Sequence, residues 1–80
     1  MAKLIPLDGA IRILVSPLTL TALQGYVHGF VEFIELSSGD LIVVNEESLN
    51  GLGGLNMSAS ALAGQLIYGH VVLCEPNEIA

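Results

Sequence analysis

The amino-acid sequence predicts a single small α+β domain, built on a mainly antiparallel sheet with its helices on one face. Branched apolar residues recur at every second position over residues 10–15, which is the period of a β-strand. Two further strand-like runs flank a polar turn at residues 37–40, as in a β-hairpin. Helix starts at Ser16-Pro17 and at Asn56 lie between these strands, so the element order is β-α-β-β-α-β.

This order is that of the ferredoxin-like fold. A looser sheet with both helices on one face is the alternative, because the second helix is short. The 80 residues form one domain, residues 1–80, in which 1–9 and 75–80 are expected to be peripheral or frayed.

The first half of the chain contains one helix and the predicted hairpin. Ser16 is expected to cap a helix over residues 18–25, since a proline follows at the favoured first helical position. The next strand covers residues 27–36 and ends in the polar turn, where Gly39 is free to adopt a positive φ. Residues 41–44 then run back as a continuous apolar strand.

The second half contains a polar corner, a glycine-rich segment, a helix and a strand. Residues 51–55 hold three glycines, too many for regular structure. Asn56 is expected to cap a short helix through Ala63, because Gly64 stands where a left-handed residue usually ends a helix. The last strand is expected over residues 66–74.

The composition predicts self-association. Hydrophobic residues make up 52% of the chain and there are nine glycines besides, above the roughly 45–50% that the two together usually reach. A domain this small buries only about 60% of the surface that its unfolded chain exposes. The single cysteine excludes an internal disulfide. We therefore expect a homo-oligomer whose interface covers part of the apolar surface.

The charge excludes two classes of partner. The net charge is −6, with only two lysine and arginine residues in the whole chain. Nucleic-acid binding and attraction to an anionic membrane both need a basic surface, so neither partner is expected. No apolar run is long enough to cross a bilayer, and the first residues do not resemble a secretion signal. We expect a cytoplasmic protein.

The reactive side chains do not predict catalysis. Cys74 lies near the end of an apolar strand and is expected to be a core residue. His28 and His70 could meet across strands, although local hydrogen bonding is the favoured interpretation. Glu46 and Glu47 are adjacent and point apart on an extended segment, so they do not form an acid–base pair. No cofactor and no metal site are expected.

The sequence also resembles a small family of unknown function from phage, plasmid and bacterial genomes. The resemblance covers about residues 11–74 and rests on a Val-Val-Asn-Glu-Glu corner at 43–47, a Gly-Leu segment and an Ala/Leu helix. Ser48 departs from the glycine that usually follows the acidic pair, and Gly53-Gly54 replace a common proline. The resemblance implies a phage or mobile-element context and no particular chemistry.

We therefore predict a non-enzymatic counter-defence protein that sequesters a small nucleotide-derived signal in a pocket formed with other subunits. The glycine segment before Asn56 could hold an anion through backbone N–H groups, although it matches no phosphate-binding fingerprint. Two alternatives stay open, an acidic inhibitor that docks on a host defence or nucleic-acid enzyme, and a plain interaction module. The expected ligand-binding residues are Arg12, Asn45, Glu46, Glu47, Gly51, Gly53, Gly54, Asn56, Tyr68 and His70.

Overall fold

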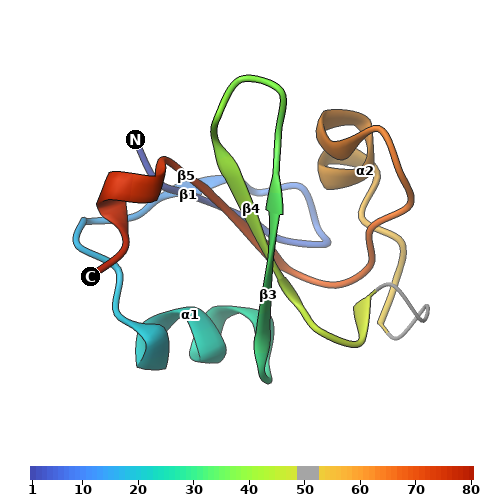
Figure 1. Ribbon diagram of the computed structural model, residues 1–80. Coiled ribbons are helices and arrows are strands. Elements are labelled where there is room, and N and C mark those ends of the chain that lie inside the picture. The colour runs from blue at the N-terminus through green and yellow to red at the C-terminus, as the bar shows by residue number, and fades with distance from the viewer. Residues whose placement is uncertain (49–52) are drawn as a thin grey trace.

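The computed structural model describes residues 1–48 and 53–80 and contains a five-stranded sheet with two helices. The elements are β1 (Lys3–Ile5), β2 (Arg12–Ile13), α1 (Leu20–Val27), β3 (Val31–Glu35), β4 (Leu41–Asn45), α2 (Met57–Ala63), β5 (Val71–Cys74) and a 3₁₀ turn (Pro76–Glu78) (Figure 1). The strand order is β2-β1-β5-β4-β3, and every neighbouring pair is antiparallel. The α+β class and the antiparallel sheet are confirmed. The ferredoxin-like arrangement is not adopted, because it requires parallel neighbours.

The N-terminal segment lies inside the sheet, so the expectation that residues 1–9 are peripheral was wrong. β1 pairs with β2 on one side and with β5 on the other. Leu4 and Ile5 are both buried, one in each of the two apolar clusters. Successive strand side chains point to opposite faces, so this short strand contributes to both clusters. The strand predicted over 10–15 shrinks to the two residues of β2.

The two helices lie on opposite faces of the sheet, which corrects the prediction that they share one. Leu23 of α1 packs in a cluster with Val43 and Val72 on what we call the α1 face. Ala59 of α2 packs with Ile42 and other residues on the α2 face. Within β4 these contacts alternate between the faces, as the pleat requires. In the described part of the chain neither helix is long and apolar enough to cross a membrane.

The first helix begins and ends later than predicted. Thr19, rather than Ser16, is its N-cap, and the Thr19 hydroxyl accepts a hydrogen bond from the Ala22 N–H at 3.1 Å. The helix ends at His28, which adopts left-handed backbone angles with φ 63°. The following strand therefore starts at Val31 instead of residue 27.

The C-terminal residues are held against the start of α1, so the expectation that 75–80 are peripheral was also wrong. The Leu18 N–H donates to the Glu78 carbonyl at 2.7 Å, and the Ala80 N–H donates to the Leu18 carbonyl at 2.8 Å. The Ser16 hydroxyl donates to the Glu78 carboxylate at 2.6 Å. The backbone N–H of Glu75 and this hydroxyl lower the pKa of Glu78 to about 2.

The hairpin and the second helix agree with the sequence. Gly39 in the turn between β3 and β4 has φ 91°. Asn56 caps α2, and Gly64 ends it in the left-handed region with φ 69°. The last strand begins at residue 71 instead of 66, because the chain first runs back along α2. In that segment the Ile67 N–H donates to the Ser60 hydroxyl at 2.8 Å.

Candidate functional site

A groove of about 340 Å³ opens at one end of the sheet. The end of α1, the end of β4 and the segment before β5 meet there. Among its lining residues are five that the sequence predicted, Asn45, Glu47, Gly53, Tyr68 and His70. Leu7, Val27, His28 and Gly69 complete the lining. The groove is therefore built from segments far apart in the sequence that end at the same edge of the fold.

Two histidine rings form the central feature of this groove. The ring centroids of His28 and His70 lie 5.4 Å apart, with the planes tilted by 53°. The Nδ1 atom of His70 accepts a hydrogen bond from the Leu7 N–H at 3.0 Å. In the neutral ring the hydrogen is therefore on Nε2, which has no hydrogen-bond acceptor among residues 1–48 and 53–80. The sequence had suggested that these two histidines could meet, but His28 was not among the predicted ligand-binding residues.

The backbone of His28 explains how its ring reaches this position. His28 is the only described residue other than glycine with a positive φ. Residues other than glycine rarely adopt a positive φ, so this conformation is expected to be stabilised by a specific contact. Here the His28 N–H donates to the Gln24 carbonyl at the end of α1. Ending the helix in this way turns the chain beside His70.

Asn45 positions the groove from within. Its side-chain amide donates to the carbonyls of Val27 at 3.1 Å and His28 at 3.3 Å. Its side-chain oxygen accepts from the Glu47 N–H at 2.9 Å. The first two bonds join the end of α1 to the end of β4, and the third holds the corner that follows β4. Asn45 is thus a positioning residue of the groove that it lines, and its role in ligand binding stays a prediction.

Substituting Gly29 by alanine is expected to distort this arrangement. A Cβ atom at Gly29 would lie 2.6 Å from Nδ2 of Asn45 and would displace the amide. We expect the free energy of unfolding to fall by roughly 1–3 kcal/mol, since two carbonyls lose their donor. Gly25→Ala is the matched control, because nothing lies within 4 Å of its added Cβ and alanine favours a helix interior by roughly 0.5–1 kcal/mol. Urea denaturation compares the two variants, and equal stability would contradict the prediction.

Arg12 lies at a second hollow that adjoins the first across the histidine pair. This hollow has a volume of about 280 Å³ and shares His28 and His70 with the groove. Arg12 and Asp8 are its charged residues. The predicted site is therefore divided, with Glu47 on one side of the histidines and Arg12 on the other.

Three further predicted residues, Glu46, Gly54 and Asn56, are not brought into the groove. Glu46 is exposed and lines neither hollow. The carbonyl of Gly54 accepts a hydrogen bond from the Gly69 N–H at 2.8 Å, which joins the glycine segment to the segment before β5. Asn56 is 2% exposed, and its amide bonds internal backbone groups. Gly51 lies outside the described residues.

The described residues do not bring metal-ligating side chains together. Among residues 1–48 and 53–80, no three His, Cys, Asp or Glu side chains lie close enough to hold a metal ion. Cys74 is 1% exposed in the cluster on the α1 face, and burial raises the pKa of its thiol. This position gives Cys74 a packing role.

Comparisons of the chain with protein-family models, with curated protein sequences and with solved structures give no match. The resemblance to the phage and plasmid family therefore stays a prediction.

Proposed function

We propose that this protein is a non-enzymatic binding protein that sequesters a nucleoside carrying at most one phosphate. The observation that supports this most directly is the divided site around His28 and His70. One hollow offers a carboxylate and an aromatic ring, and the other offers an arginine. A nucleotide has the same division between its base and its phosphate.

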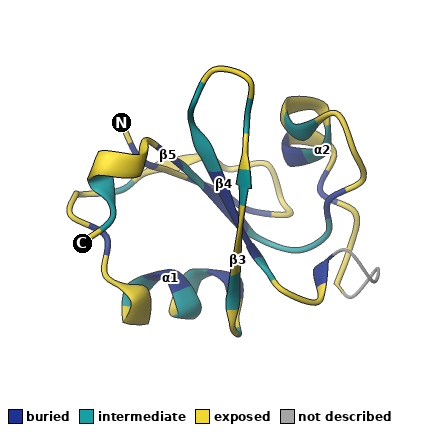
Figure 2. Cartoon of the chain, viewed as in Figure 1, coloured by how far each residue is buried: buried dark blue, intermediate teal, exposed yellow. Residues whose placement is uncertain are grey.

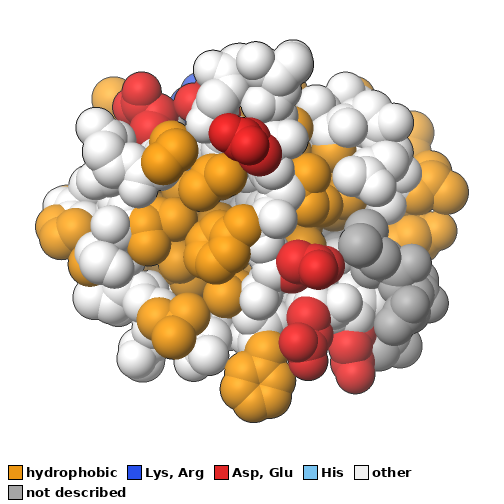
Figure 3. Space-filling model, in the orientation of Figure 1, with side chains coloured by type: hydrophobic (Ala, Val, Ile, Leu, Met, Phe, Trp, Pro, Cys, Tyr) orange, Lys and Arg blue, Asp and Glu red, His pale blue; other side chains and the backbone are white. Residues whose placement is uncertain are grey.

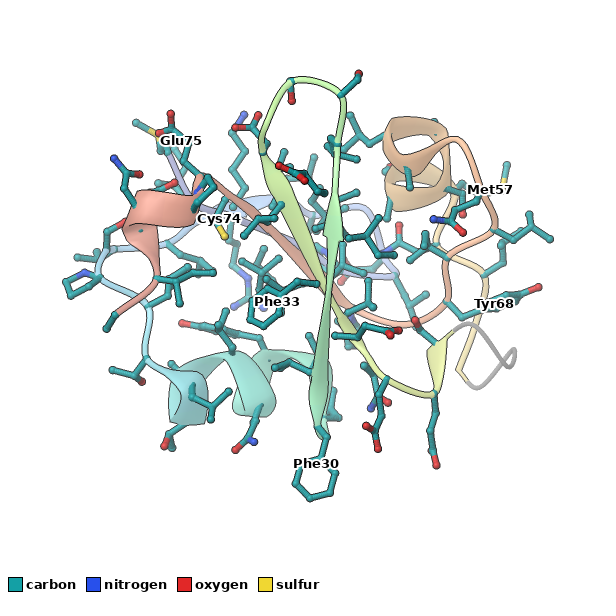
Figure 4. The ribbon with its side chains drawn as sticks, viewed as in Figure 1. Phe30, Phe33, Met57, Tyr68, Cys74 and Glu75 are labelled. Carbon is teal, nitrogen blue, oxygen red and sulfur yellow. The ribbon has the colours of Figure 1, made fainter. Side chains whose placement is uncertain are left out.

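The base is assigned to the groove that contains Glu47 and Tyr68. The carboxylate of Glu47 can accept a hydrogen bond from a ring N–H or an amino group, and adenine, guanine and cytosine each present at least one of these donors. Tyr68 is half-buried and lines the groove, and its ring extends outward from the fold (Figure 4). Such a ring stacks on a base whatever its identity. Leu7 and Val27 supply apolar surface, as most small-molecule sites do.

The number of phosphates is limited by charge. Among the described residues that line either hollow, Arg12 is the one lysine or arginine, and Asp8 and Glu47 are the two carboxylates. A triphosphate would place several negative charges among these carboxylates. A single phosphate near Arg12 avoids most of that repulsion.

Calorimetric titration with adenosine, guanosine and their 5′-mono- and triphosphates tests this assignment. The monophosphate should bind more tightly than the nucleoside and the triphosphate. Glu47→Gln should weaken binding by about tenfold or more, as for loss of a charge-assisted hydrogen bond. Glu46→Gln is the matched control, because it makes the same charge change outside the groove. Arg12→Ala should abolish the preference for the monophosphate over the nucleoside.

Two results would overturn the proposal. One is the absence of heat with all six compounds. The other is an equal effect of the two glutamine substitutions, which would indicate a general charge effect. The acidic inhibitor remains the second candidate, because Glu32, Glu46 and Glu47 are all exposed near the start of β3 and the end of β4. If the protein captures a basic enzyme, and Glu46→Gln weakens that capture, the result would favour the acidic inhibitor.

The biological setting and the partners belong to the same proposal. Sequestering a nucleotide signal inside a bacterial host would serve a phage or mobile element against a defence system. Further copies of this chain are the other proposed partner. Within residues 1–48 and 53–80, twelve large hydrophobic side chains are exposed by two-fifths or more, among them Phe30 at 68% and Met57 at 73%. Association would cover part of this surface.

A further inference from the structure

We propose that two copies of this chain associate through the free edge of β3, with the two strands antiparallel and Phe33 at the two-fold axis. β3 is the outermost strand of the sheet, and nothing in the described chain pairs with its outer side. Figure 2 shows β3 exposed or half-buried beside a largely buried β4. This interface does not depend on the proposed ligand.

The backbone of β3 presents three complete donor–acceptor positions to its outer side. The Leu36 N–H donates to the Asp40 carbonyl at 2.8 Å, and the Glu46 N–H donates to the Phe30 carbonyl at 2.9 Å. In an antiparallel ladder the bonded residues alternate along the strand. The even-numbered residues of β3 therefore bond to β4, and the odd-numbered residues direct their N–H and C=O groups outward. These outward groups belong to Val31, Phe33 and Glu35.

A two-fold axis at Phe33 pairs all three positions. Phe33 then exchanges two hydrogen bonds with the partner's Phe33, and Val31 exchanges two with the partner's Glu35. No other antiparallel self-pairing aligns all five residues of β3. Moving the axis to Glu32 or to Glu35 would set two carboxylates directly opposite each other, which is destabilising. The acidic residues on this edge therefore disfavour those two alternative registers.

The side chains support the same register. Phe33 is 44% exposed, and its ring lies over the α1 face (Figure 4). Figure 3 shows hydrophobic side chains gathered on this face between α1 and β3. The pairing places the two Phe33 rings side by side, and an aromatic pair of this kind is worth about 0.5–1.5 kcal/mol beyond its buried area. On the α2 face it places the exposed Phe30 beside the partner's Leu36, and Glu32 opposite the partner's Ile34.

Sedimentation velocity from micromolar to millimolar concentration tests the interface without any ligand. The wild-type protein should approach twice the 8.4 kDa monomer mass. Phe33→Glu should weaken association by about tenfold or more, because it replaces an aromatic pair by two opposed carboxylates. Met57→Glu is the matched control, because it adds the same charge at an exposed apolar side chain of α2. Circular dichroism confirms that each variant is folded.

Charge complementation distinguishes a lost interface from a damaged fold. Mixing Phe33→Glu with an isotope-labelled Phe33→Lys variant should restore dimers, and native mass spectrometry should find them to be mostly mixed. A wild-type monomer at millimolar concentration would overturn the proposal. So would a dimer that Phe33→Glu leaves intact, or one that Met57→Glu disrupts instead. Mixed dimers that fail to form from two folded variants would also contradict it.

Discussion

Replacing Asn56 by leucine is expected to remove a large part of the stability of this domain. The Asn56 side-chain amide donates to the carbonyls of Ile5 at 3.0 Å and Gly69 at 2.9 Å. Its side-chain oxygen accepts from the Ala59 N–H at 3.1 Å. These bonds join β1, the segment before β5 and the first turn of α2. Leucine would leave all three backbone groups without this partner at a site that is 2% exposed.

The expected loss is about 3–5 kcal/mol, because each buried group without a partner costs about 1–3 kcal/mol. Domains of this size have a total stability of about 5–10 kcal/mol. Urea denaturation followed by circular dichroism measures the change. Thr19→Ala is the control, since it removes only the cap of α1 and should cost about 1 kcal/mol. Equal losses in the two variants would show that Asn56 acts as a helix cap and nothing more.

Asn56→Asp separates the two functions of this side chain. The carboxylate still accepts from the Ala59 N–H, but it cannot donate to the carbonyls of Ile5 and Gly69. It also buries a negative charge beside those oxygens. We expect a loss as large as for leucine. A mild effect would assign the stability to capping.

The second large effect is expected at Leu23, the residue that anchors α1. Leu23 is fully buried and packs against Leu18, Val43 and Val72. Leu23→Ala should lower the free energy of unfolding by about 3 kcal/mol, from lost apolar burial and the cavity left behind. Leu20→Ala in the same helix is the control. Leu20 is 55% exposed, so its loss should stay below about 1 kcal/mol.

Leu23→Ala should also change the geometry of the groove. The helix ends at His28, so a loosened α1 changes where that ring lies relative to His70. Nuclear magnetic resonance should show the ring signals of both histidines shifting in Leu23→Ala and remaining in place in Leu20→Ala. Unchanged histidine signals in a destabilised Leu23→Ala variant would show that the geometry of the groove does not depend on the packing of α1.

The features that could be predicted are those whose signals lie close together along the chain. Asn56 and Gly64 bracket α2 within one short segment, and Gly39 marks the hairpin turn. Each signal acts through the backbone of its immediate neighbours, so no distant contact decides it. The uninterrupted apolar run of β4 was also informative. A strand that is apolar on both sides is covered on both faces, and this favoured helices on opposite faces over the arrangement that we predicted.

The residues that line the groove were only partly predictable, because their positions depend on contacts between distant segments. Glu47, Tyr68 and His70 were recognised by their chemistry, and the fold brings them to one groove. Asn45 and Asn56 have similar chemistry, but both use their amides on backbone groups from other segments. Those partners become neighbours only after the sheet has formed.

The sequence by itself determined the α+β class, the antiparallel hairpin, the limits of α2 and the acidic character, because these depend on local backbone preferences and on composition. Tertiary structure alone decided that Lys3–Ile5 is an inner strand, that the helices lie on opposite faces, and that His28 meets His70. The physical reason is the range of the interactions. β1 is stable as a strand only when β5, more than sixty residues away, supplies its hydrogen bonds and covers its apolar side chains.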